Sequence, residues 1–223
     1  MMQISFEEAA IGHGLEAEVP PLTMTIESGV PVAIAVETDE RPLLVSMMLG
    51  GRIHPDAGRI LVDGREDLDE LRRRTALVDT PFVSEANAGT ALRVIVAEEF
   101  AFASMPTATR FVRRFLAQHQ LKDYTNLPLR ALPPVKRIEL FSELAVLRPG
   151  VEGIVVTAPE RHGGSPSDWY GSLAAIANRG LTVAIVTNVA TARALLALGA
   201  LPPLAADTVA AGDSAASSSP IEG

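Results

Sequence analysis

The sequence GGRIHPDAGRILVDG, residues 50–64, decides the fold of this chain. Gly50 and Gly51 follow the apolar segment PLLVSMML, and glycine at such a point is typical of the end of a helix. The Pro-Asp-Ala-Gly run predicts a turn, and GRILVDG predicts a short strand. A charged helical segment, EDLDELRRR, and another short strand, TALVDTP, come next. Helices and strands therefore alternate around this stretch.

Further apolar segments extend the alternation in both directions. Residues 2–6 and 22–28 alternate like paired strands, and Gly29 leads into the apolar run 30–36. Residues 151–159 (VEGIVVTAP) and 181–188 (LTVAIVTN) contain continuous apolar, β-branched runs. Such runs are typical of central parallel strands that are buried on both faces. We therefore expect an α/β fold with a mostly parallel sheet.

This order of elements resembles the ATP-binding (nucleotide-binding) domain of ABC transporters over nearly the whole chain. Residues 50–64 are similar to the segment after the family's phosphate-binding helix. Residues 151–159 resemble its Walker B strand, and residues 181–188 resemble the strand that ends in its switch histidine. The resemblance implies a P-loop NTPase-like (ABC ATPase-like) fold. It has a mostly parallel sheet with flanking helices, an N-terminal antiparallel β element and a small helical lobe.

The resemblance also implies the domain organisation. We expect a single ABC ATPase-like domain over residues 1–203, with the helical lobe at about 81–147. Residues 204–223 are rich in Ala, Ser, Gly and Asp and hold few large apolar groups, so we expect a disordered tail there. The helical periodicity within the lobe falls into three segments, residues 86–105, 107–120 and 134–147.

Composition narrows the classes of protein. The 223 residues are 48% hydrophobic, which is enough for one core. The formal net charge of −8 argues against nonspecific nucleic-acid binding. The chain has no Cys and no apolar run of the ~20 residues that cross a bilayer, and its first residues do not resemble a signal peptide. We expect a cytoplasmic protein without direct membrane insertion, held at the membrane only through a partner.

The segment that matches the family's phosphate loop departs most from the family. That loop, GxxGxGK[ST], uses glycine N–H groups, a lysine and a hydroxyl to hold phosphates and Mg²⁺. Residues 36–43 here read VETDERPL, with neither glycine nor lysine. Like charges ~4 Å apart repel by about 4 kcal/mol at an effective dielectric of about 20, so the three carboxylates oppose a triphosphate. We expect no cofactor binding at the degenerate loop equivalents, which are Glu37, Thr38, Asp39, Glu40, Arg41 and Pro42.

Other positions that contact nucleotide in the family depart as well. Thr157 and Ala158 replace the Walker B acids, while Pro159 is retained. Asn188 stands at the switch histidine. The signature segment LSGGQ corresponds to LPPVK at residues 132–136. The family's glutamine that reaches Mg²⁺ and water is missing near residues 79–80, and its aromatic that stacks on adenine is missing near residues 10–12. The four histidines lack metal-ligand spacing.

A retained scaffold with altered chemistry indicates a pseudoenzyme with a degenerate Walker A loop. We therefore expect a degenerate family member that is not an enzyme and has no catalytic residue, cofactor or metal. It would act as a non-catalytic binding or regulatory subunit. The alternative is a divergent ATP-binding subunit of an ABC transporter that still binds or hydrolyses ATP. Mg-ATP binding distinguishes the two.

The family's membrane subunits insert a short helix beside the segment that corresponds to residues 78–85, VDTPFVSE. Pro81 and Phe82 form an apolar step in this polar loop, and we expect them to bind a protein partner. The partner would be a membrane subunit or another ABC-type ATPase. The helices that follow carry Phe100, Phe102, Phe111 and Phe115, which either face the partner or all pack internally.

Overall fold

A computed structural model describes residues 1–37 and 41–204. Its four-stranded parallel sheet has the order β3-β7-β6-β5. The strands are β3 (Val32–Ala35), β5 (Thr75–Val78), β6 (Gly153–Thr157) and β7 (Thr182–Thr187). β6 and β7 pair in parallel from Gly153 opposite Thr182 to Thr157 opposite Val186. The two segments expected as central parallel strands are therefore neighbours.

The second sheet is antiparallel and has the order β2-β1-β4. Its strands are β1 (Ile4–Ile11), β2 (Val19–Ile26) and β4 (Ala57–Val62). It is the expected N-terminal antiparallel element, with the strand of the 50–64 stretch added to it. The expected fold class is confirmed.

Seven α-helices and four 3-10 helices connect the strands in the described part of the chain. The α-helices are α1 (Arg41–Leu49), α2 (Leu68–Arg74), α3 (Leu92–Phe102), α4 (Thr109–Gln118), α5 (Pro134–Ala145), α6 (Pro166–Ala177) and α7 (Val189–Ala197). The 3-10 helices are η1 (Gly14–Glu16), η2 (Lys122–Tyr124), η3 (Leu129–Ala131) and η4 (Pro159–His162). None of the helices in the described ranges is long and apolar enough to cross a membrane.

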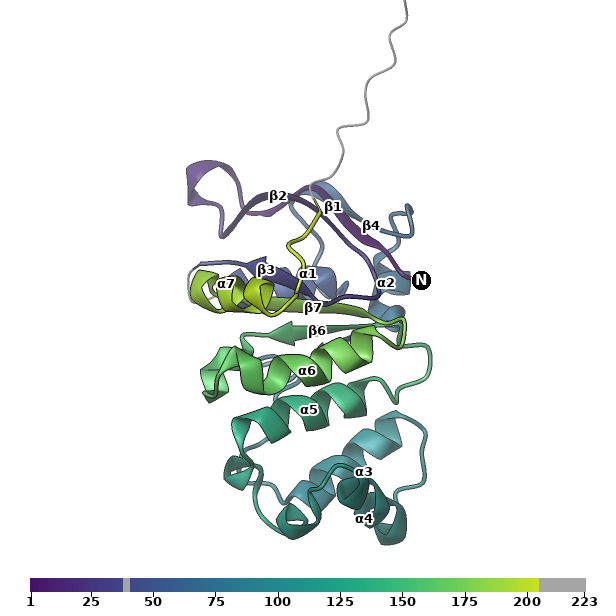
Figure 1. Cartoon of the computed structure of the whole chain (residues 1–223). Coiled ribbons are helices and arrows are strands. Elements are labelled where there is room, and N and C mark those ends of the chain that lie inside the picture. Colours follow the sequence, from purple (N-terminus) through teal and green to yellow (C-terminus); the bar gives the residue numbers. More distant parts are fainter. Residues whose placement is uncertain (38–40, 205–223) are drawn as a thin grey trace, which may run out of the picture.

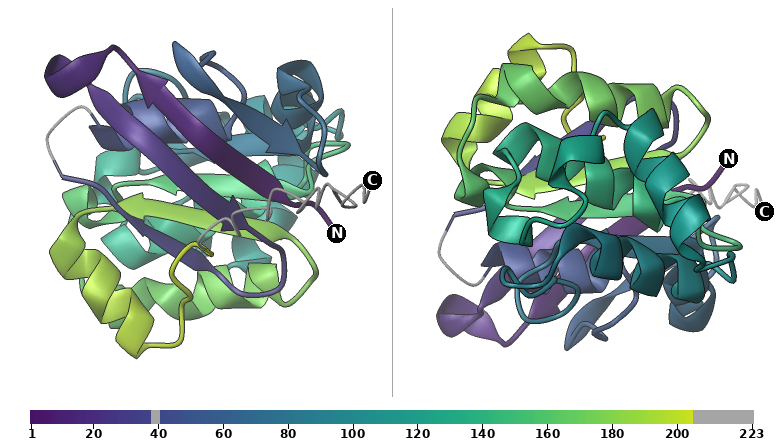
Figure 2. Two further views of the ribbon diagram at one scale, coloured as in Figure 1. Left: turned by 90° about the horizontal axis from the view of Figure 1, so that it is seen from above. Right: turned by 90° about the horizontal axis from the view of Figure 1, so that it is seen from below.

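The layers lie above one another in Figure 1. The antiparallel sheet covers α1 and one face of the parallel sheet, α5 and α6 cover the other face, and α3 and α4 lie beyond α5. Figure 2 shows the same stacking from above and below. Residues 92–118 thus form a separate helical layer far from the N-terminal sheet. The expected tail lies almost entirely outside the described residues.

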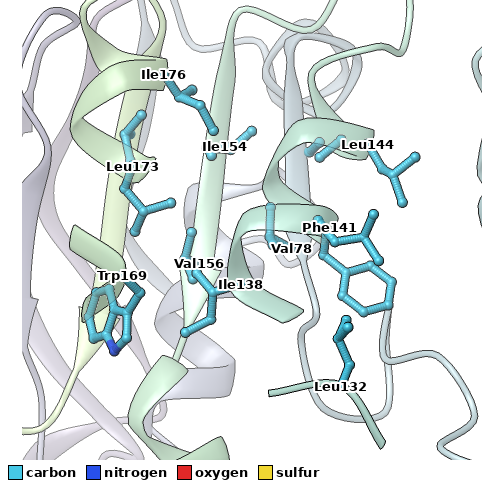
Figure 3. Packing of buried hydrophobic residues seen from close by; sticks show 14 of the residues in the cluster. Val78, Leu132, Ile138, Phe141, Leu144, Ile154, Val156, Trp169, Leu173 and Ile176 are labelled. Atoms are coloured by element: carbon cyan, nitrogen blue, oxygen red, sulfur yellow. The ribbon is translucent and has the colours of Figure 1, made fainter. Parts of the chain in front are cut away.

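Alternating side chains of the parallel strands pack into two hydrophobic cores, one on each face of the sheet. Val155 faces the core shared with α1 and the antiparallel sheet, whereas Ile154 and Val156 face the helices. Figure 3 shows this second core, where Trp169 and Ile138 flank β6. Both faces of β6 are buried, which explains why its sequence is continuously apolar.

Two glycines explain why residues 50–64 fold as they do. Gly51 has φ +65° and ends α1, with Gly51 N–H bonded to Met48 C=O and Arg52 N–H bonded to Met47 C=O. This is a Schellman motif, in which glycine at the left-handed position costs least. Gly58 has φ +70°, and a Cβ there would lie 2.2 Å from the Glu8 carbonyl oxygen. Only glycine allows β4 to approach β1 this closely.

Candidate functional site

The candidate site lies at the carboxyl ends of β3, β6 and β7. A cavity of about 650 Å³ opens there, beside the start of α1 and α7. Open α/β sheets bind ligands outside the carboxyl ends of their strands. Four positions predicted from the sequence line this cavity together, namely Glu37, Pro42, Ala158 and Asn188. Thr38, Asp39 and Glu40 lie outside the described residues. Arg41 begins α1, and its Nε donates to the Glu18 carbonyl oxygen at 2.7 Å.

Glu160 is a lining residue that the sequence analysis missed. Its carboxylate accepts hydrogen bonds from Thr187 Oγ1 at 2.7 Å and from the Asn188 backbone N–H at 3.1 Å and side-chain Nδ2 at 2.9 Å. Asn188 Oδ1 in turn accepts the Thr191 N–H at 2.8 Å and so caps α7. Both ends of the Asn188 amide are thus engaged. The only sequence signal for Glu160 was a carboxylate directly after the retained Pro159.

A chain of buried hydroxyl groups lies at the end of β6. Thr157 Oγ1 is 2.8 Å from Thr80 Oγ1 and donates to Ser46 Oγ at 2.8 Å. All three side chains are at most 1% exposed. The chain joins β6, the loop after β5, and α1, and it satisfies these hydroxyls without any charge. Thr157, which we expected at the position of a Walker B acid, therefore has a structural role in holding three elements together.

Beside this chain, Asp79 is the centre of an ion-pair cluster. Arg137 donates to both of its oxygens at 2.6 and 2.8 Å, and His162 Nε2 lies 2.8 Å from Oδ2. Arg161 Nη2 is 3.5 Å from Asp79 Oδ2, and Glu85 lies 3.5 Å from Arg137 and 3.4 Å from Arg161. Burial raises the pKa of the Asp79 carboxyl, but the close contact with His162, the hydrogen bonds from Arg137 and the charges of Arg137 and Arg161 outweigh burial and lower it.

The cluster joins three elements that are distant in sequence, namely the loop after β5, helix α5 and η4. The oxygens of Asp79, Glu85 and a nitrogen of His162 lie within 4.8 Å of one another, which is close enough for a metal. However, both Asp79 oxygens already accept bonds from Arg137, and both carboxylates face arginines. The arrangement is therefore that of an ion-pair cluster rather than of an open ligand set.

The predicted partner-binding residues lie next to the cluster. Phe82 is 96% exposed and has φ +60°, an uncommon conformation for a bulky residue. A mostly apolar cavity of about 490 Å³ runs from Pro81 and Phe82 to Leu43, Leu44 and Ala158. Asp79 and Ala158 also have positive φ. Strained residues that lie together mark a candidate functional surface.

The four phenylalanines of α3 and α4 were expected either to face a partner or to pack internally, and they divide between these alternatives. Phe100 and Phe115 are 2% and 9% exposed and pack edge to face with ring centroids 5.3 Å apart. Phe111 is partly buried against the same core, whereas Phe102 is 69% exposed. The internal packing of this layer is therefore nearly complete without Phe82 and Phe102.

Two further segments that differ from the family, residues 132–136 and 10–12, have structural roles. In the segment 132–136, Leu132 is buried and Pro134 begins α5 at a position where a missing N–H costs nothing. Ala10 is buried in β1, and Gly12 N–H donates to Asp56 at 2.7 Å. Neither segment reaches the lining of the 650 Å³ cavity.

Comparisons with known proteins support the fold. No family model matches the chain. The "Biotin transport ATP-binding protein BioM" of Rhizobium etli is 27% identical over 101 residues, which is 45% of this chain and 43% of that protein. The match thus spans less than half the length of the relative.

Solved structures match over more of the chain. A nucleotide-free ATP-binding cassette from an ABC transporter gives a TM-score of 0.62 at 15% identity over 85% of this chain and 82% of that one. CbiO1 of Clostridium perfringens, part of the ABC transporter complex cbiONQ, gives 0.57 at 18% identity over 83% and 78%. A bacterial Atm1-family ABC exporter with ATP bound gives 0.60 at 15% identity over 85% of this chain and 35% of that one.

These findings correct one expectation. The prediction that the chain is not an enzyme is wrong, because the relative that it matches is a transport ATP-binding protein and the solved structures with its fold include an ATP-binding cassette of an ABC transporter. The prediction relied on the sequence at the positions that contact nucleotide in the family, and altered residues at such positions do not by themselves establish the loss of an activity. The homologue and the structural neighbours of this chain are ABC transporter ATP-binding domains, and the chain has their fold.

Proposed function

We propose that this chain is a divergent ATP-binding subunit of an ABC transporter that works with a membrane subunit. The observation that carries the proposal is the 650 Å³ cavity at the carboxyl ends of β3, β6 and β7. It gathers the positions that correspond to the phosphate loop, Walker B and the switch. The homologous ATP-binding protein supports the same assignment. Through its partner, the subunit would lie at the cytoplasmic face of the membrane.

The residues at this cavity do not fit Mg-ATP held in the family's manner. Glu37 and Glu160 present carboxylates, and Arg193 is the only cation among the described lining residues. Asn188, at the switch position, is engaged by Glu160 and by α7. Thr157 is engaged by two other hydroxyls. We therefore propose that this chain binds nucleotide more weakly than the family's phosphate loop does, and in a different geometry.

Calorimetry with Mg-ATP tests this part of the proposal. We expect a dissociation constant near millimolar, roughly −4 kcal/mol, because one arginine faces two carboxylates. Arg193→Ala should weaken binding further, whereas Arg65→Ala, an exposed arginine remote from the cavity lining, should not change it. Micromolar affinity would contradict a divergent site. No binding by folded protein at about 10 millimolar would contradict an ATP-binding subunit.

The second part of the proposal concerns the partner. Pro81 and Phe82 would contact a membrane subunit or a second ABC-type ATPase. Phe82 is exposed, yet its loop is anchored by the Asp79 cluster, so the side chain is presented on a fixed support. An exposed aromatic beside an apolar cavity is typical of an interface anchor.

Affinity purification from detergent-solubilised membranes tests this contact. The wild-type chain should recover a polytopic membrane protein or an ABC-type ATPase, identified by mass spectrometry. Phe82→Asp should lose it. Leu15→Asp is the matched control, because Leu15 is also fully exposed but lies in η1. Equal recovery with a folded Phe82→Asp chain would rule this surface out.

A further inference from the structure

A groove lies between α3 and α4, the helices that Figure 1 shows farthest from the N-terminal sheet. Its volume is about 370 Å³. Small apolar side chains of both helices line it, namely Val94, Ala97, Ala101 and Val112. Because these side chains are short, the two helices leave room for side chains of another molecule.

Two arginines line this groove, and two more lie on α4. Arg93 of α3 and Arg113 of α4 line it, and Arg110 and Arg114 are exposed on the same α4 helix. The only carboxylate among the lining residues is Glu98. The groove lining therefore carries a net positive charge, from two arginines and one glutamate, in a chain whose formal net charge is −8.

The four arginines have no ion-pair partner in residues 1–37 and 41–204. Arg93 donates to the neutral Asn126 Oδ1 at 3.2 Å, and the Arg110 guanidinium lies 4.7 Å from the Phe111 ring centre. Seven other arginines form ion pairs with acids in the described part of the chain, namely Arg59, Arg73, Arg74, Arg137, Arg148, Arg161 and Arg179. Four arginines without an ion-pair partner in these ranges thus lie on two helices that pack against each other.

We propose that the α3–α4 groove binds a protein segment that carries carboxylates. Apolar side chains of that segment enter between the helices, and its Asp or Glu residues pair with Arg93 and Arg113. Arginine suits this role because its planar guanidinium binds carboxylates through two parallel hydrogen bonds. The concave apolar floor favours a peptide segment over a flat lipid surface.

This surface is separate from the proposed function described above. The groove shares no lining residue with the 650 Å³ cavity or with the cavity at Phe82. Its occupancy therefore depends neither on nucleotide nor on the Phe82 contact. A failure of one proposal leaves the other standing.

Fluorescence anisotropy with the full chain tests the inference. The probe is a labelled peptide of about twelve residues in which Glu alternates with Leu and Ala, and the reference peptide has Lys in place of Glu. We expect the acidic peptide to bind and the Lys peptide to bind at least about tenfold more weakly. Raising NaCl from about 50 to about 500 mM should weaken binding of the acidic peptide.

Variants locate the contact. Arg93→Glu and Arg113→Glu should each weaken binding by at least about tenfold, and Ala101→Trp, which fills the groove without changing charge, should abolish it. Arg65→Glu is the charge-matched control and should stay within about twofold. Both groove arginines are exposed, so the reversed charges should leave the fold intact, which circular dichroism checks.

Three results would overturn the inference. They are no binding of the acidic peptide, equal binding of the Lys peptide, or unchanged affinity in the folded Arg93→Glu and Arg113→Glu variants. Vesicles of anionic phospholipid form a further arm. If the chain binds these vesicles through the same arginines and not the acidic peptide, the surface is a lipid contact and the proposal is wrong.

Discussion

Replacing Arg137 by Met tests the ion-pair cluster, which is the most connected polar feature near the candidate site. Arg137 and Asp79 are 7% and 6% exposed, and two hydrogen bonds of 2.6 and 2.8 Å join them. Removing one member of a buried pair generally costs about 3–5 kcal/mol, because the other charge stays buried. Met keeps the apolar stem that packs around α5.

The cost here should be smaller than that general range. His162 remains 2.8 Å from Asp79 Oδ2 and Arg161 remains 3.5 Å away, so the carboxylate keeps part of its compensation. We therefore expect a loss of about 2–3 kcal/mol in the free energy of unfolding. For a chain of this size that corresponds to a fall in Tm of about 4–12 °C.

Urea denaturation measures the loss, with the slope m compared between variants to exclude a change in the unfolded state. Arg179→Met is the matched control. Its ion pair with Glu143 is 3.1 Å long but Arg179 is 46% exposed, so its loss should cost less than about 1 kcal/mol. A loss below about 1 kcal/mol for Arg137→Met as well would refute the view that this cluster anchors the loop.

Three further predictions concern stability. The pKa of Asp79 is lowered in the folded chain, so its stabilising contribution is present above the ordinary pKa of Asp and is lost as pH falls through the lower folded value. The difference in the free energy of unfolding between wild type and Asp79→Asn should therefore shrink on acidification, which urea titrations between about pH 6 and pH 2 measure. Thr157→Val should cost about 1–3 kcal/mol in the same assay, because it leaves the Thr80 and Ser46 hydroxyls buried without their partner, and a neutral result would contradict the hydroxyl chain. Gly58→Ala should destabilise more than Gly64→Ala, since both glycines have positive φ but only at Gly58 would a Cβ meet backbone within 3 Å; equal thermal shifts would argue against that close approach.

The strands were the most predictable part of the fold. β6 and β7 are buried on both faces, so burial alone dictates their continuous apolar sequence. Helix boundaries were less predictable. The expected helix over residues 86–105 is only Leu92–Phe102, because Ala91 is extended and forms an isolated bridge with Pro128, and residues 88–90 before it form a turn. Such a tertiary pairing leaves no local signal.

The candidate site also has a part that the sequence predicts and a part that it does not. Glu37, Ala158 and Asn188 each lie at or directly after the end of a predicted strand, so the parallel sheet brings them to one edge, and they line one cavity. The partners of Asp79 could not be predicted, because Arg137 is 58 residues away on α5 and His162 lies on η4. The spacing of the histidines predicted no role for His162, because its contact with Asp79 depends on tertiary packing alone.

Photoaffinity labelling with an azido analogue of ATP tests the central claim most directly, because it reports both binding and location. Mass spectrometry should find the label on peptides that contain Pro42, Ala158 to Glu160, or Asn188 to Arg193, and excess Mg-ATP should remove it. Labelling elsewhere on the folded chain, or labelling that Mg-ATP does not compete, would contradict a divergent ATP-binding subunit with its nucleotide at the carboxyl ends of β3, β6 and β7.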